Sequence, residues 1–133
     1  MVLKTSAALL RDVLTANDHA DCFLGHSGGD DFVMVVPADL IDDVCKAAVT
    51  SFDRMIPTMY AEEDLRRGYI EVQDRRGEPR HFGMVSMAIG VTSNLHRDFD
   101  DHRHMVLVAT EMKSHVKQLG NDTSSYAVDG RTV

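Results

Sequence analysis

The stretch from His26 to Phe32, with the sequence HSGGDDF, decides the fold class of this chain. It joins a short apolar run at residues 22–26 to a second apolar run at residues 31–36. Two short apolar runs on either side of a glycine-rich turn predict a β-hairpin. Further along the chain, helices alternate with a second hairpin, which indicates an α+β layer fold with helices packed on an antiparallel sheet.

The residues at the tip of this hairpin have a composition that suits a nucleotide and a metal ion. The paired glycines Gly28 and Gly29 let backbone N–H groups approach a base or a phosphate, because no Cβ is in the way. The adjacent carboxylates of Asp30 and Asp31 offer oxygen ligands to a hard divalent cation. Judged on spacing alone, the same four residues also make an ordinary solvated turn.

Apolar residues recur at helical spacing in three segments, which predicts three amphipathic helices. The first covers residues 3–16 and the last covers residues 100–118. The second is predicted to begin with Asp39 as its N-cap and to end before Pro57. Five methionines on the predicted core faces are interpreted as packing residues, namely Met34, Met84, Met87, Met105 and Met112.

The remaining segments complete the predicted order α-β-β-α-β-β-α-β. Residues 60–68 are rich in charge and predict a solvated turn of helix or a loop. Residues 69–72 alternate between apolar and polar side chains and form a second predicted hairpin with a long strand over residues 79–91. Residues 125–128 predict a short final strand.

Composition limits the class of protein. A chain of 133 residues has the size of one domain, so residues 1–133 are predicted to form a single domain. Hydrophobic residues at 44% and charged residues at 26% exclude a disordered or collagen-like chain. A formal net charge of -7 repels nucleic-acid backbones, and no basic run is longer than Arg75-Arg76, so we expect no nucleic-acid partner.

The cysteines and the apolar segments indicate the compartment. Cys22 and Cys45 have no CxxC spacing and follow no secretory signal, which predicts free thiols in a reducing environment. No apolar stretch approaches the roughly 18 residues that cross a bilayer, so no membrane segment is predicted. We therefore expect a cytoplasmic location.

The acids and histidines at residues 100–104 are a weaker candidate for a site. His102 and His104 are two residues apart and point to different sides of a helix, whereas a metal site needs convergent ligands. We interpret this cluster as a solvated helix start, where acids favour the positive end of the helix dipole.

Three blocks in order resemble the GGDEF domain family of diguanylate cyclases. Residues 28–32, GGDDF, match the family signature with Asp31 where the family has glutamate. Residues 85–91, VSMAIGV, resemble a serine- and glycine-containing strand of the family. In residues 109–121, Lys117 and Gly120 match the lysine and glycine of the motif A-K-x-x-G in its last helix. The resemblance covers nearly the whole chain.

The resemblance implies a palm-like α+β fold, and the joining of two GTP molecules into cyclic di-GMP with release of pyrophosphate. Mg²⁺ would stabilise the developing phosphate charge. Gly28 and Gly29 would lie against the nucleotide, and Asp30 would be a metal ligand. Asp31 would assist the metal or the attacking hydroxyl, which makes Asp30 and Asp31 the candidate catalytic pair. Lys117 would contact the terminal phosphates, although a lysine near a helix C-terminus also complements the helix dipole.

The chain also departs from the family pattern. In the family, a first strand and helix that carry a metal-binding aspartate precede the matching residues, and we expect this chain to lack them. The chain is therefore expected to bind Mg²⁺ poorly, and open strand edges predict a homodimer or a rearranged sheet. His26 and Asn121 replace family arginines, while His19 and Cys22 replace the arginine and aspartate of the inhibitory product site.

The sequence leaves three functional hypotheses. The first is an incomplete GGDEF-type cyclase domain, expected to be inactive as this chain alone, whose parent protein carries an upstream sensory or receiver domain. The second is a degenerate, non-catalytic GGDEF module that binds a nucleotide or a protein partner. The third is a small α+β structural domain in which the Gly-Gly turn occurs by chance.

Overall fold

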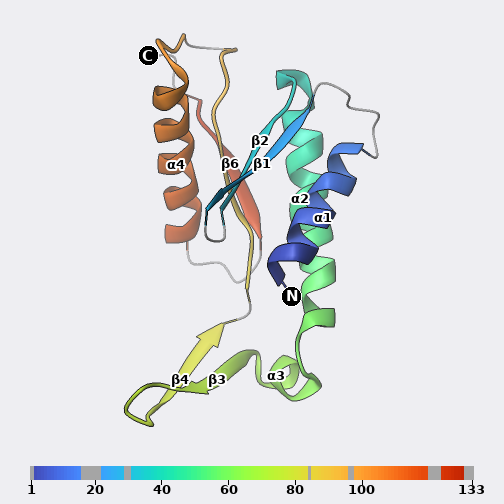
Figure 1. Cartoon of the computed structure of the whole chain (residues 1–133), viewed down its shortest axis with the longest axis vertical. Helices are drawn as coiled ribbons and strands as arrows, with labels where there is room; N and C mark the ends of the chain where they lie inside the picture. Colours follow the sequence, from blue (N-terminus) through green and yellow to red (C-terminus); the bar gives the residue numbers. More distant parts are fainter. Residues whose placement is uncertain are drawn as a thin grey trace.

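The computed structural model describes residues 2–15, 22–28, 31–83, 85–95, 98–119 and 124–130, and these form a mixed α+β fold (Figure 1). The order of the main helices and strands agrees with the prediction. The helices are α1 (Val2–Thr15), α2 (Ile41–Met55), α3 (Glu62–Arg67) and α4 (His102–Gln118), with 3₁₀ turns at Ala38–Leu40 and Ile56–Met59. The strands are β1 (Phe23–Gly28), β2 (Asp31–Val35), β3 (Tyr69–Gln73), β4 (Pro79–Gly83), β5 (Ala88–Val91) and β6 (Ser125–Val128).

The first predicted hairpin is confirmed. Strands β1 and β2 pair antiparallel, with Leu24 opposite Met34. Because successive side chains of a strand alternate between its faces, one face of the hairpin packs on the helices and the other is left open. Leu24 and Met34 contact the core around Val13, Leu14 and Val44, which confirms the packing role of Met34.

The core lies between this hairpin, α1 and α2. Helical periodicity predicted the buried faces of both helices, and the structure buries residues at that spacing. They are Leu10, Val13 and Leu14 of α1 and Val44, Cys45, Ala48 and Phe52 of α2. The predicted N-cap of α2 is wrong: Asp39 lies inside a 3₁₀ turn, and the N-cap position falls on Leu40 without a side-chain hydrogen bond.

The β5–α4–β6 unit corrects the expectation of a purely antiparallel sheet. Strands β5 and β6 pair parallel, with Ile89 opposite Tyr126, because α4 carries the chain back to the end at which β5 began. The long strand predicted over residues 79–91 is interrupted, with β4 ending at Gly83 and β5 beginning at Ala88. The described strands therefore form three two-stranded sheets instead of one.

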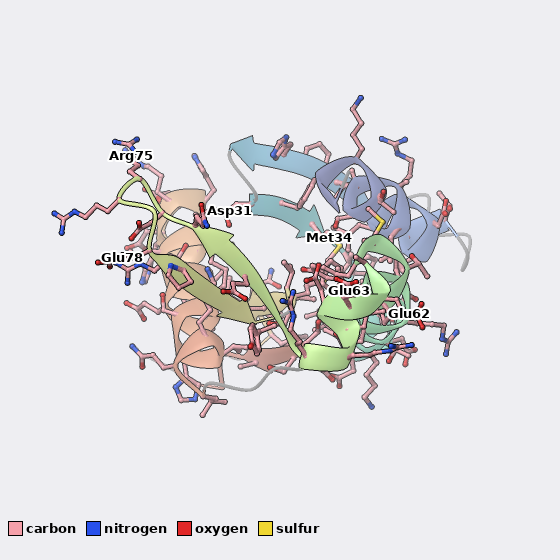
Figure 2. The ribbon with its side chains drawn as sticks, turned by 90° about the horizontal axis from the view of Figure 1, so that it is seen from below. Asp31, Met34, Glu62, Glu63, Arg75 and Glu78 are labelled. Atoms are coloured by element: carbon pink, nitrogen blue, oxygen red, sulfur yellow. The ribbon has the colours of Figure 1, made fainter. Side chains whose placement is uncertain are left out.

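The second hairpin, β3–β4, projects from the end of the molecule where α3 lies (Figure 1). The Asp74 carboxylate accepts backbone N–H bonds from Glu78 and Arg76, each at 2.9 Å, and these bonds lower the pKa of Asp74. Glu62 and Glu63 of α3 are exposed, which confirms the solvated character expected of residues 60–68. Figure 2 shows Arg75 and Glu78 at the end of the hairpin.

Helix α4 begins with a side-chain cap. The Asp101 carboxylate accepts N–H bonds from Arg103 at 2.8 Å and from His104 at 3.1 Å. His102 and His104 are exposed, so this segment is the solvated helix start that the sequence predicted. The bond from the His104 amide, together with that from Arg103, lowers the pKa of Asp101.

The cap makes stability depend on pH in a predictable direction. Because the pKa of Asp101 is lower in the folded chain than the unfolded value of about 3.9, the cap stabilises fully above that pH and is lost as pH falls through the folded pKa. Asp101→Asn keeps an oxygen acceptor but does not titrate. We expect the variant to match the parent at pH 7 and to lose less stability under acid, measured by urea unfolding. Identical acid profiles would contradict a charged cap.

Candidate functional site

The tip of the β1–β2 hairpin is the candidate site. Gly28 pairs with Asp31 across the turn, and a register shift between His26 and Gly28 marks a bulge just before the tip. The rings of His26 and Phe32 stack with their centroids 4.9 Å apart. Several residues that the sequence analysis named lie outside the described residues. They are His19, Gly29, Asp30, Met84, Gly120 and Asn121.

An ion pair joins this tip to α4. The Lys113 ammonium lies 3.1 Å from the Asp31 carboxylate, which is 82 positions away in the sequence. The Asp31 side chain is 51% exposed and the Lys113 side chain only 28%, so the lysine is held largely within the protein. In Figure 2, Met34 of β2 lies beside α1 and α2, whereas Asp31 of the same strand lies on the side of α4.

A glycine sets the position of Lys113. A Cβ added to Gly90 of β5 would fall far inside van der Waals distance of the Ala109 carbonyl oxygen and the Lys113 amide nitrogen. Only a residue without a side chain allows the backbone of α4 to lie this close to β5. Gly90 belongs to the strand block that the sequence singled out, and its physical role here is to seat the helix that carries Lys113.

Lys117 lies one helical turn beyond Lys113 and is exposed. Residues four apart share a helix face, so both lysines lie on the face of α4 that reaches toward the hairpin. Lys117 has no ion-pair partner in the part of the chain that the structure describes. Sequence reasoning identified Lys117 and missed Lys113, which the i, i+4 spacing from Lys117 would have revealed.

Asp30, the metal ligand that the resemblance implies, lies outside the described residues, so the predicted Mg²⁺ site stays a prediction. Its neighbour Asp31 is paired with the Lys113 ammonium. Across the described residues, no group of three or more His, Cys, Asp or Glu side chains converges on one point. The described residues place the positive charge of the Lys113 ammonium group beside the hairpin tip.

The Cys45 thiol is not suited to nucleophilic chemistry. Within the described residues, Cys22 and Cys45 take part in no disulfide. Burial, and then the charge of Asp42, raises the pKa of Cys45 to about 11. Since the thiolate is the reactive form, Cys45 is inert at neutral pH and acts as a core residue.

A polar network that the sequence did not predict fastens α2 to the β5–α4–β6 unit. The Asp53 carboxylate accepts the Ser124 hydroxyl proton at 2.5 Å and the Ser124 amide at 3.1 Å. The Ser124 hydroxyl accepts the Met87 amide at 2.7 Å. The Tyr126 hydroxyl donates to Asp42 at 3.2 Å, and burial together with that carboxylate raises the pKa of Tyr126. These bonds hold β6 and the residue before it against α2.

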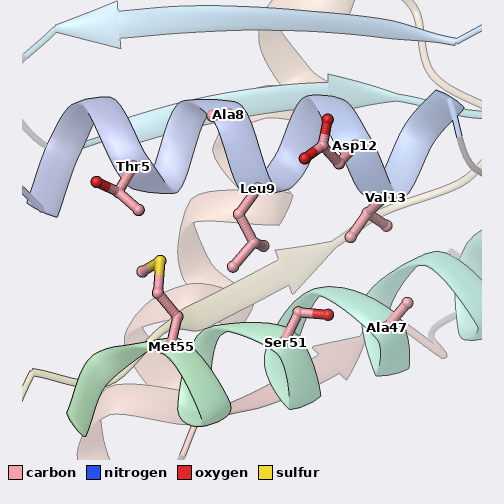
Figure 3. Close-up of a pocket in the computed structure, with 8 residues that line it drawn as sticks. All are labelled: Thr5, Ala8, Leu9, Asp12, Val13, Ala47, Ser51 and Met55. Atoms are coloured by element: carbon pink, nitrogen blue, oxygen red, sulfur yellow. The ribbon is translucent and has the colours of Figure 1, made fainter. Parts of the chain in front are cut away.

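A concave region lies between α1 and α2 (Figure 3). It is an open groove of about 500 Å³, lined by small and apolar side chains together with the carboxylate of Asp12. None of the predicted site residues lines it. The lining residues are Thr5, Ala8, Leu9, Asp12, Val13, Ala47, Ser51 and Met55.

Comparison of the chain with protein-family models, with curated proteins and with solved structures finds no match. Among the described residues, no helix combines the length and the apolar character needed to cross a bilayer. The site must therefore be interpreted from its own geometry.

Proposed function

We propose that this chain is a GGDEF-type domain of a signalling protein that binds a guanine nucleotide at the tip of the β1–β2 hairpin. The ion pair between Asp31 and Lys113 carries the proposal, because it brings the signature hairpin and the last helix to one place. The nucleotide would lie against Gly28, with its phosphates toward Lys113 and Lys117. Paired lysine ammonium groups are suitable partners for phosphate.

The fold supports this proposal at the level of element order. The first hairpin is followed by α2, a second hairpin and then the β5–α4–β6 unit. This order suits the palm-like arrangement that the resemblance implies. The intact family converts two GTP molecules, one on each of two facing domains, so we propose a homodimer as the working form of a complete protein.

We propose that the chain by itself does not form cyclic di-GMP. Joining two nucleotides requires strong stabilisation of charge at the attacked phosphorus, which Mg²⁺ supplies in the family. Here the Asp31 carboxylate is paired with the Lys113 ammonium, which competes with a metal ion for its oxygens. Binding without turnover is therefore the function that we propose for this chain.

A second candidate is a non-catalytic module that senses a nucleotide or holds a protein partner. The stacking of His26 on Phe32 favours it, because an imidazole ring occupies the position at which the family has an arginine. The apolar side chains Phe23, Val33 and Val35 on the open face of the hairpin are also compatible with a protein contact.

Calorimetric titration with GTP tests the proposal. We expect GTP to bind and Lys117→Ala to weaken binding about tenfold, the usual effect of losing one charged hydrogen bond. Lys46→Ala is the matched control, since Lys46 is an exposed lysine on α2, and it should leave the affinity unchanged.

An assay of the same mixtures for cyclic di-GMP tests whether the chain turns over the bound nucleotide. No product from the parent chain, together with GTP binding, supports the proposed binding without turnover. Product formation would contradict our assignment of an inactive chain. Failure of GTP to bind would contradict the nucleotide site itself.

A further inference from the structure

We propose that the exposed face of α1, together with the groove between α1 and α2, docks against the same face of a second copy of this chain. The inference goes beyond the proposed nucleotide site and does not depend on it. It rests on the order of charges along α1 and on the groove beside that helix. The order of charges selects a second copy as the occupant, because the row of charges is complementary to itself.

The exposed face of α1 carries a row of three residues. Lys4, Ala8 and Asp12 are spaced four apart, so they follow one another along one side of the helix, and all three are exposed. The lysine and the aspartate are about 12 Å apart along the helix axis, well beyond ion-pair distance. Within the described residues, neither of their side chains forms an ion pair. Both charges are therefore available to a partner.

An antiparallel second copy satisfies both charges at once. A two-fold axis that passes through Ala8 places Lys4 of each copy opposite Asp12 of the other, which gives two symmetric ion pairs. A parallel arrangement would place like charges opposite each other, which disfavours association. The small side chain of Ala8 at the crossing point allows the two helices to approach closely.

The groove between α1 and α2 gives the second helix a place to lie. The two helices run antiparallel, with Thr5 opposite Met55 and Val13 opposite Ala47 (Figure 3). The space between them is an open groove of about 500 Å³, and Leu9 in its wall is only half-buried. A groove between two packed helices is the kind of surface that accepts a third helix.

The two parts of this surface have different roles in docking. Helix α1 of the second copy would cover the apolar side chains of the groove, which supplies the driving force for association. The Asp12 carboxylate lies in the groove wall, so a lysine from the second copy meets it there and fixes the direction of the helix. Helices α1 and α2 of both copies would then form a four-helix arrangement.

Analytical ultracentrifugation of the full chain tests the proposal. We expect the parent chain to be mainly dimeric at about 100 µM and to dissociate on dilution, because a small interface gives weak association. Lys4→Asp and Asp12→Lys each place like charges opposite one another and should weaken association at least tenfold. Lys46→Asp is the control: Lys46 is exposed on α2 and is not among the described residues that line the groove, so association should be unchanged.

Combining the two reversals tests the antiparallel pairing itself. An equimolar mixture of the Lys4→Asp and Asp12→Lys variants should form a dimer again, because two acids on one copy then face two bases on the other. The double variant Lys4→Asp/Asp12→Lys should associate with itself as the parent does, although each single change weakens association. The double variant has the same net charge as the parent, so its recovery depends on the positions of the charges alone.

The apolar part of the surface has its own variant. Ala8→Trp adds a bulky side chain where the helices cross, and it should prevent the dimer. Because Ala8 is exposed in the single chain, the variant should still fold, which circular dichroism checks.

The contrary outcomes are distinct from those of the nucleotide site. A parent chain that stays monomeric at about 100 µM would overturn the second copy as occupant of the groove. A dimer that both reversals leave intact would overturn this surface, and a loss that neither the mixture nor the double variant recovers would overturn the antiparallel pairing. Failure to bind GTP would overturn only the proposed function.

Discussion

Replacing Gly90 by alanine is expected to destabilise the chain by about 3 kcal/mol, the upper range for forcing extra atoms into a closely packed interface. The new Cβ would collide with the backbone of α4 at Ala109 and Lys113, and backbone cannot move aside as a flexible side chain can. Helix α4 would have to shift away from β5. Urea unfolding followed by circular dichroism measures the loss.

The same substitution should also impair the candidate site. A displaced α4 carries Lys113 away from Asp31, so GTP binding should fall together with stability. Gly130→Ala is the matched control, because a Cβ at Gly130 has nothing within 4 Å. If Gly90→Ala were as stable as Gly130→Ala, the close approach of α4 to β5 would be contradicted.

Replacing Phe52 by alanine is expected to cost about 4 kcal/mol of unfolding free energy, the usual penalty for removing a large aromatic side chain from a core. Phe52 is only 3% exposed and lies on the buried face of α2, next to Ala48. Removing its ring loses burial and leaves a cavity that its neighbours fill only in part. The measurement is urea or thermal unfolding at neutral pH.

Phe23→Ala provides a control of the same residue type. Phe23 lies on the open face of β1 and is 58% exposed, so its loss should change stability by no more than about 0.5 kcal/mol. A larger loss for Phe23 than for Phe52 would mean that the open face of the hairpin is covered in solution.

The hairpin tip shows how far sequence patterns reach. The apolar runs around Gly28 and Gly29 predicted the hairpin, and Met34 was predicted to pack on the core. The direction of β6 was not predictable in the same way. Whether a strand pairs parallel or antiparallel depends on the path of the connecting helix, which four residues of strand do not encode.

The lysines of α4 show the same limit within the site. Lys117 was found because it falls in a recognisable motif, while Lys113 was passed over although it lies four residues earlier on the same helix face. Its partner Asp31 is 82 positions away, and only the packing of α4 on Gly90 brings the two together. The Asp53–Ser124 contact, 71 positions apart, was missed for the same reason.

By itself, therefore, the sequence determined the α+β class, the places of the main helices and of most strands, and the buried faces of α1 and α2. These depend on the period of apolar residues, which is a local property of the chain. The tertiary structure decided which buried faces meet, how β6 runs, and that an ammonium group lies beside Asp31. The physical reason is that periodicity shows that a face is covered, while only packing in three dimensions selects the element that covers it.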